Sequence, residues 1–215
     1  YPPSSLVGGE DSIVQVEITN IGYADAGPFR LDMYIDGQYE ISWDYPGLPA
    51  WIYSELSVTI TDGLFAGAHN IQFIVDATEV VSESNEGNNT RTETFTWTGT
   101  PDLEVTSIYA PSSLVGGEDS LFQAKITNLG YADAGPFWLD MSIDGEYSYS
   151  WNFPGGLPAR NYSERSVTLT GGLFAGTHYI QFTVDATEVV SESNEGNNTR
   201  TVTFTWTGTP DLEVT

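Results

Sequence analysis

The sequence predicts an all-β protein that consists of two similar β-sandwiches, one following the other. Three observations lead to this fold class. A stretch of about 109 residues occurs twice in the chain, and residues 76–91 return unchanged as residues 185–200. Within each copy apolar and polar residues alternate, and glycine-containing turns interrupt the alternating runs. Such alternation gives each strand one buried and one solvated face, as antiparallel sheets require.

The alternating runs of the second copy define its strands in order. Asp36-Gly37 and Asp144-Gly145 lie between such runs and predict type I′ hairpin turns, which need positive φ at both central residues. About seven short strands, with turns every ~8 to 12 residues, predict an immunoglobulin-like sandwich without its disulfide. The expected strands of the second copy cover residues 102–108, 122–127, 137–144, 147–151, 167–170, 178–184 and 201–206.

The limits of the repeat predict two modules and a remainder. Pro101-Asp102-Leu103-Glu104-Val105-Thr106 opens the second copy and returns as residues 210–215, whereas the first copy has no such opening. We therefore expect a sandwich over residues 1–100 that lacks its own first strand and a complete sandwich over 101–209. Residues 210–215 are expected to form the first strand of a following module, in a longer chain or in another subunit.

Such a remainder predicts head-to-tail assembly of the protein with itself. Ladder hydrogen bonds would hold an inserted strand, and Leu212 and Val214 would fill pockets of the acceptor. Each of these two side chains contributes roughly 1.5 to 3 kcal/mol when buried. Contacts that do not close on themselves produce filaments, so either a homopolymer or a longer covalent array is expected. The assembly strand comprises Asp211, Leu212, Glu213, Val214 and Thr215.

The composition excludes several classes of function. The formal net charge is −24, from 30 acidic and 6 basic residues, so nucleic acid and anionic lipid are not expected as partners. No apolar run approaches the length of a membrane-spanning helix. Cysteine is absent, which excludes disulfides and thiol catalysis. No nucleophile with a neighbouring base is apparent either, so we expect no catalytic residues and no enzyme activity.

One loop in each copy concentrates oxygen-bearing side chains, which are the ligands that calcium prefers. Calcium is therefore a candidate ligand, with a dissociation constant on the order of 10⁻⁴ to 10⁻³ M as in other extracellular modules. The alternative is that these side chains bind turn amides and hold the last two strands in register. The candidate ligands are Asp76, Glu79, Glu83, Asn85, Glu86 and Asn88 in the first copy and Asp185, Glu188, Glu192, Asn194, Glu195 and Asn197 in the second.

Three Asn-x-Ser/Thr sequons give weak support to an extracellular location. The candidate glycosylation sites are Asn88, Asn161 and Asn197.

The same loop contains the string Glu-x-Asn-Glu-x-Asn-Asn, at residues 83–89 and 192–198. Together with the Pro-Asp-Leu opening and Thr-Asn-x-Gly at residues 127–130, it resembles the CARDB domain, the cell-adhesion-related domain of bacterial and archaeal surface proteins. The resemblance covers nearly all of both copies. It implies an immunoglobulin-like sandwich in a secreted, repeat-built surface protein, and it does not imply catalysis.

Two functions are compatible with these observations. The first is a structural subunit or repeat segment of an extracellular filament, fibre or surface stalk, which explains the repeat, the acidity and the short connection between copies. The alternative is an adhesin that recognises glycan or a cell surface, which the resemblance and the outward aromatic residues Trp51, Trp138, Tyr149 and Tyr179 favour.

Overall fold

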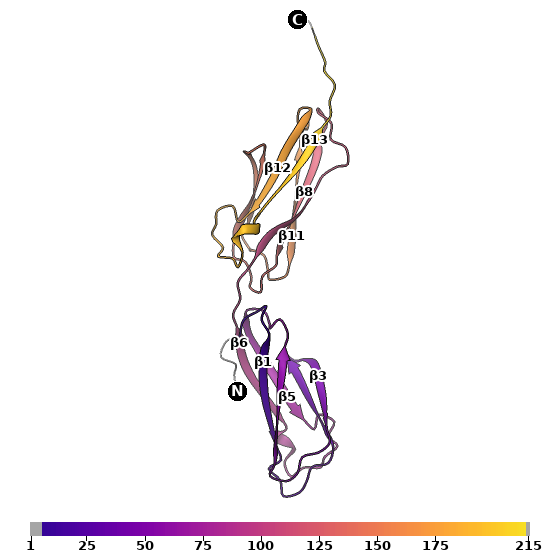
Figure 1. Ribbon diagram of the computed structural model, residues 1–215, viewed down its shortest axis with the longest axis vertical. Helices are drawn as coiled ribbons and strands as arrows, with labels where there is room; N and C mark the ends of the chain where they lie inside the picture. Colours follow the sequence, from indigo (N-terminus) through magenta and orange to yellow (C-terminus); the bar gives the residue numbers. More distant parts are fainter. Residues whose placement is uncertain (1–5, 214–215) are drawn as a thin grey trace. The chain divides into compact units, whose positions relative to one another are not determined.

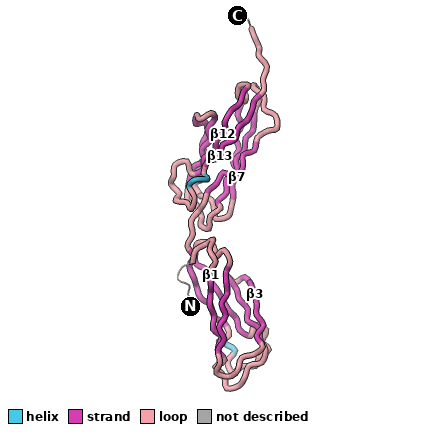
Figure 2. The backbone as a smooth tube through the Cα atoms, viewed as in Figure 1, coloured by secondary structure: helices cyan, strands magenta, loops and turns pink. Residues whose placement is uncertain are grey.

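The computed structural model describes residues 6–213 of the chain, which belong to two compact units. We call residues 1–99 the first module and residues 100–215 the second module. Strands dominate both modules, and one short 3-10 helix lies in each, η1 (Glu86–Asn88) and η2 (Glu195–Asn197) (Figure 2). The predicted all-β class is therefore confirmed. No helix in residues 6–213 combines the length and the apolar character that crossing a membrane requires.

The strands follow the alternating runs of the sequence. Those of the first module are β1 (Ser12–Thr19), β2 (Phe29–Ile35), β3 (Gln38–Tyr45), β4 (Tyr53–Ile60), β5 (Gly67–Val75) and β6 (Thr90–Trp97). Those of the second module are β7 (Leu103–Tyr109), β8 (Ser120–Asn128), β9 (Phe137–Ile143), β10 (Glu146–Phe153), β11 (Tyr162–Leu169), β12 (Gly176–Val184) and β13 (Thr199–Trp206).

The second module is a sandwich of two antiparallel sheets. One sheet has the order β10-β9-β12-β13 and the other has the order β11-β8-β7. Figure 1 labels β8 and β11 of the smaller sheet and β12 and β13 of the larger one. The opening strand β7 pairs with β8 and also packs across the sandwich against β12 and β13. It thereby covers one side of the core between the two sheets.

The first module repeats this architecture with one difference. Its larger sheet has the order β3-β2-β5-β6, matching the larger sheet of the second module. Its smaller sheet contains, within the described residues, β1 and β4 alone. The edge of β1 that corresponds to the β7-paired edge of β8 therefore has no strand beside it in this part of the chain.

The turns and the cores follow from the sequence pattern. Asp144 and Gly145 have φ of 52° and 87°, and Asp36 and Gly37 have φ of 49° and 79°. Both turns thus have the positive φ that type I′ hairpins need at both central residues. Trp97 and Trp206 are each 1% exposed and belong to the cores of their modules. Phe122 of the second core replaces the smaller Val14 of the first, and Ala124 replaces the larger Val16, so the total core volume is nearly kept.

We predict that the two central strands of the smaller sheets exchange their amide hydrogens at different rates. β8 has a paired neighbour on both edges, whereas β1 has one, and amides without a hydrogen-bonded partner exchange through solvent without local unfolding. Hydrogen exchange read by mass spectrometry should therefore show residues 12–19 exchanging faster than residues 120–128 in dilute protein. Equal protection in the two peptides would contradict an open edge at β1.

Candidate functional site: a strand-acceptor groove

The start of β7 is held by backbone hydrogen bonds from the turn that follows β8. The amide of Leu129 donates to the carbonyl of Asp102 at 2.6 Å, and the amide of Tyr131 donates to the carbonyl of Thr100 at 3.1 Å. The side-chain oxygen of Asn128 accepts the amide of Asp102 at 3.1 Å. Thr100 and Asp102 are thus fixed before the regular ladder of the sheet begins.

The acidic loop between β12 and β13 holds the same segment from the opposite side. A carboxylate oxygen of Glu192 accepts the amide of Leu103, and the amide of Ser193 donates to the carbonyl of Pro101 at 2.9 Å. The side-chain amide of Asn197 donates to the carboxylate of Asp102 at 2.9 Å. The Glu-x-Asn-Glu-x-Asn-Asn string therefore contacts the Pro-Asp-Leu opening, a pairing that the sequence reasoning did not anticipate.

Glycine at position 130 is required by this close approach. A Cβ placed there would lie 2.3 Å from the carbonyl oxygen of Thr100 and 2.6 Å from the amide nitrogen of Asp102. The equivalent Gly22 of the first module meets no backbone atom, because its nearest neighbour is the side-chain oxygen of Asn20 at 3.1 Å. The two positions have the same residue, and within residues 6–213 only one of them has a strand beside it.

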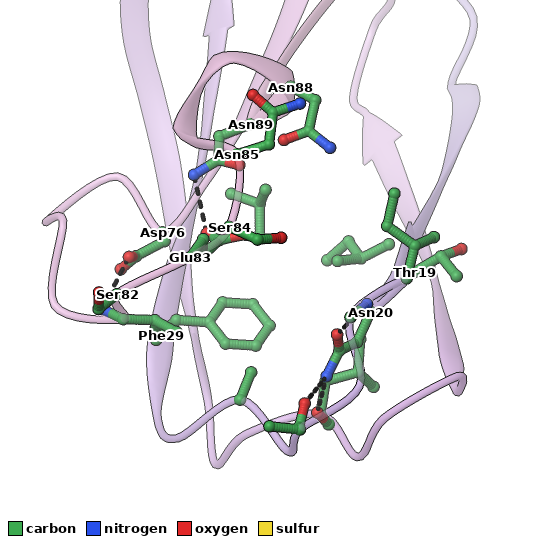
Figure 3. Close-up of a pocket in the computed structure, with 18 of the residues that line it drawn as sticks. Thr19, Asn20, Phe29, Asp76, Ser82, Glu83, Ser84, Asn85, Asn88 and Asn89 are labelled. Atoms are coloured by element: carbon green, nitrogen blue, oxygen red, sulfur yellow. Dashed lines mark hydrogen bonds between the residues drawn. The ribbon is translucent and has the colours of Figure 1, made fainter.

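The first module has a cavity of about 290 Å³ in the corresponding place. Figure 3 shows Thr19 and Asn20 on one side of this space and the loop residues Glu83, Asn85 and Asn88 on the other. Apolar side chains of Ile18, Phe29, Leu48, Val75 and Val81 also line it. We call this space, together with the open edge of β1, the strand-acceptor groove.

The polar groups of the groove are already in position. Asn20 donates to the carbonyls of Ala24 and Leu48 and accepts the amide of Gly22, which fixes its side chain as the equivalent bonds fix Asn128. A carboxylate oxygen of Glu83 accepts the side-chain amide of Asn89, as Glu192 accepts that of Asn198. These polar side chains of the open groove therefore make the same internal hydrogen bonds as their counterparts beside β7.

Two buried aspartates organise the loops. Asp76 and Asp185 are 3% and 1% exposed, and each accepts two backbone amides through its two carboxylate oxygens. The carboxylates of Glu86 and Glu195 accept the amides of the loop residues Glu83 and Glu192. The side chains of Asn85 and Asn194 accept the amides of the glycines two residues further on.

These bonds bear on the calcium prediction. The side chains of Glu79 and Glu188 are exposed, and most of the other candidate oxygens already accept hydrogen bonds. Within residues 6–213 no group of three or more acidic or histidine side chains is arranged to hold a metal ion. Calcium binding therefore stays a prediction.

The three sequons differ in their surroundings. Asn161 is exposed, and its side-chain oxygen accepts the amide of Tyr162. Asn197 is half-buried, with its side-chain nitrogen bonded to Asp102. A glycan at Asn197 would be attached to this same nitrogen, which would keep one hydrogen to donate. Asn88 is exposed and lines the cavity of the first module, so a glycan there would extend from the wall of this cavity.

The segment expected to form the assembly strand leaves the second sandwich after β13 (Figure 1). Its Leu212 is 94% exposed, whereas Leu103, at the same place in an identical heptapeptide, is 0% exposed. Asp211 and Glu213 are also exposed. Val214 and Thr215 lie outside the described residues. Leu212 is thus exposed to solvent, although its counterpart Leu103 in the identical segment lies in the core of the second module.

Burial alters the acidity of the loop carboxylate that contacts β7. The desolvation of Glu192 raises its pKa, and the hydrogen bonds from Leu103 and Asn198 offset part of this rise. The neighbouring carboxylates of Glu195 and Asp185 add to the rise. The docked strand is therefore held by a carboxylate that takes up a proton more readily than an exposed glutamate.

Comparisons with known proteins bear on both modules. The CARDB family profile matches residues 1–93 and again residues 100–202. The chain is similar to the crystal structure of the CARDB domain of a Pyrococcus furiosus protein, described as a complex with di-metal ions, at 24% identity over 50% of this chain and 90% of that one, with a TM-score of 0.46. No curated protein matches the chain.

A second solved structure comes from Methanosarcina acetivorans, from a protein named as a candidate cell surface protein. Its solution NMR structure is similar at 26% identity, covering 50% of this chain and 93% of that one, with a TM-score of 0.45.

We predict that Glu192 makes the stability of the second module depend on pH. Its pKa is raised above the ordinary value of about 4.5, so the folded module binds the proton more tightly than the unfolded chain. The contribution of Glu192 is therefore greatest at and below the ordinary pKa and is lost as the pH rises through the raised pKa. Relative to Glu192→Gln, the wild type should lose stability over that window.

The measurement is denaturant-dependent hydrogen exchange of β13 between pH 4 and pH 7. Glu83→Gln is the matched control, because it changes the same loop position in the module whose described residues include no docked strand. Parallel stability profiles for the wild type and Glu192→Gln would contradict the assignment.

The calcium hypothesis has its own test. Binding in the range of ~10⁻⁴ to 10⁻³ M should release or absorb heat on titration of calcium into chelator-treated protein, and it should raise the melting temperature. Asp185→Asn should weaken such binding in the second loop. Absence of both the heat and the rise in melting temperature would remove calcium as a ligand of these loops.

Proposed function

The chain belongs to the CARDB family, and on that premise we propose that it is a structural segment of an extracellular filament, fibre or surface stalk. In this proposal residues 1–100 and 101–209 are two modules of the assembly. Residues 210–215 supply the first strand of the module that follows. The protein acts by linking such modules end to end and has no catalytic role.

The strand-acceptor groove of the first module is the observation that supports this proposal. The corresponding place in the second module is filled by β7, whose Leu103 and Val105 are 0% and 1% exposed. In the first module the equivalent loop and Asn20, the counterpart of Asn128, line a cavity. Because the two modules have nearly the same sequence, the filled module is a template for how the open one is completed.

The proposed occupant is a strand with the sequence Thr-Pro-Asp-Leu-Glu-Val-Thr. This sequence occurs at residues 100–106, where it is docked, and at residues 209–215, whose described part is exposed. The strand comes either from another copy of the protein or from a preceding module of a longer chain. Burial of its leucine and valine contributes roughly 1.5 to 3 kcal/mol each, and the ladder hydrogen bonds add to this.

Adhesion to glycan or a cell surface is the second proposed function. Aromatic side chains on the surface of the first module support it, since Tyr23 is 92% exposed and Trp51 is 58% exposed. Their rings contact each other edge to face at 5.2 Å. Tyr23 also lines the groove, so docking of a strand would cover part of this aromatic pair.

We predict that Gly22→Ala blocks assembly while leaving the first module folded. The new methyl group meets only a side-chain oxygen in the open module, but by analogy with Gly130 it would collide with an incoming backbone. Gly27→Ala is the matched control, because a Cβ at that position meets nothing within 4 Å. Wild type and Gly27→Ala should form filaments or long oligomers, and Gly22→Ala should stay monomeric.

Sedimentation and electron micrographs of the three proteins provide the measurement. A Gly22→Ala variant that assembles like the wild type would contradict completion of the groove by a strand. The denatured mass of native material separates the two sources of the strand. A value near 23.5 kDa indicates donation between copies, and a multiple of it indicates a covalent array.

A further inference from the structure

The contacts in the second module separate into those that hold any strand and those that depend on its sequence. The amides of Leu129 and Tyr131 and the carboxylate of Glu192 contact backbone atoms, which every residue but proline provides in full. The contact between Asn197 and the carboxylate of Asp102 is different, because it depends on the side chains of both partners. This bond can distinguish one incoming sequence from another.

We infer that Asn88 and the loop around it recognise the triplet Pro-Asp-Leu in the incoming strand of a second copy of this chain, an inference that rests on the proposed function. In this arrangement the side-chain amide of Asn88 donates to the carboxylate of Asp211. Ser84 donates its amide to the carbonyl of Pro210. Leu212 enters the apolar part of the groove.

Each member of the triplet has a physical reason. Proline has no amide hydrogen, so its burial leaves no unsatisfied donor, and its carbonyl is bound in the second module by the amide and the hydroxyl of Ser193. The aspartate supplies a charged acceptor for the asparagine amide. The leucine matches a cavity lined by Phe29, Val75 and Val81. The triplet therefore combines one polar and one apolar specificity contact.

The side chain of Asn88 is accessible in the first module. Asn88 is exposed and lines the cavity, whereas its counterpart Asn197 is half-buried by the docked strand. The chain also carries a net charge of −24, so two copies repel each other at long range. A specific donor for the aspartate of the incoming strand offsets the cost of bringing another carboxylate to an acidic loop.

The occupant follows from the sequence of this chain. Residues 209–215 repeat residues 100–106 letter for letter, and the latter segment is already docked in a loop of the same sequence. Leu212 is 94% exposed where its twin Leu103 is fully buried. No other segment of the chain has both the triplet and a solvent-exposed leucine at its third position.

The test uses a full-length chain carrying Leu212→Asp, which leaves the groove open because its own assembly segment can no longer fill it. The probes are three labelled ten-residue peptides: the sequence of residues 100–109, and the same peptide with Asp102→Ala or with Asp102→Asn. Fluorescence anisotropy measures each dissociation constant against the Leu212→Asp chain and against the same chain with Asn88→Ala, Asn88→Asp or Gly22→Ala.

The unaltered peptide should bind about 10- to 100-fold more tightly than the Asp102→Ala peptide, which is the effect of one hydrogen bond to a charged group. In the Asn88→Ala chain this preference should shrink to within about twofold, because the side chain that distinguishes the peptides is gone. The Asn88→Asp chain should prefer the Asp102→Asn peptide, since donor and acceptor are then exchanged. Asn152→Ala, an exposed asparagine on β10, should change none of these values.

The outcomes separate this inference from the proposed function. If all peptides bind equally and the Gly22→Ala chain binds none, the groove accepts a strand but does not distinguish the Pro-Asp-Leu triplet. If the Asn88→Ala chain keeps the preference for the unaltered peptide, Asn88 does not recognise the aspartate, and the inference is likewise contradicted. If no peptide binds the Leu212→Asp chain, or the Gly22→Ala chain binds all three as well, the groove is not a strand acceptor and both proposals fall.

Discussion

The rest of the structure depends on how one edge of the smaller sheet is completed. This edge belongs to β8 in the second module and to β1 in the first. A strand at the edge of a sheet exposes a row of unpaired amides and carbonyls, and a sandwich with a missing strand also exposes part of its core. In the second module β7 satisfies both needs at once, because it pairs with β8 and buries Leu103 and Val105. An immunoglobulin-like sandwich whose β1 edge stays open lacks both contributions.

The need to hold the opening strand explains how the side chains of the acidic loop are arranged. Its aspartate and its paired glutamate and asparagine side chains first satisfy the amides of the loop itself. The remaining groups, on Glu192, Ser193 and Asn197, face the start of β7. The loop before the last strand of the second module is thus hydrogen-bonded to the start of its first strand.

Two copies of one sequence in different states provide an internal comparison. Gly22 and Gly130 are at equivalent positions, each preceding a tyrosine, and within the described residues the backbone of another strand lies against only one of them. Asn20 and Asn128 make the same three bonds to their own turns, and Asn128 makes a fourth to Asp102. The side chain of this asparagine is therefore held in the same way in the module with a docked opening strand and in the module whose described residues include none.

Much of the fold could be predicted from the sequence because its causes are local. Alternation at period two placed Phe137, Leu139 and Met141 in the core, and Asp144-Gly145 determined a hairpin through the positive φ that both residues adopt. The repeat also showed that the first copy has no Pro-Asp-Leu opening. The role of Glu192 and Asn197 could not be predicted in this way, since Leu103 and Asp102 lie some ninety residues away along the chain. By itself the sequence determined the fold class, the hairpin turns and the number of copies. Only the tertiary structure decided that the acidic loop faces the opening strand, because that contact arises where the two sheets of the sandwich bring the ends of the module together.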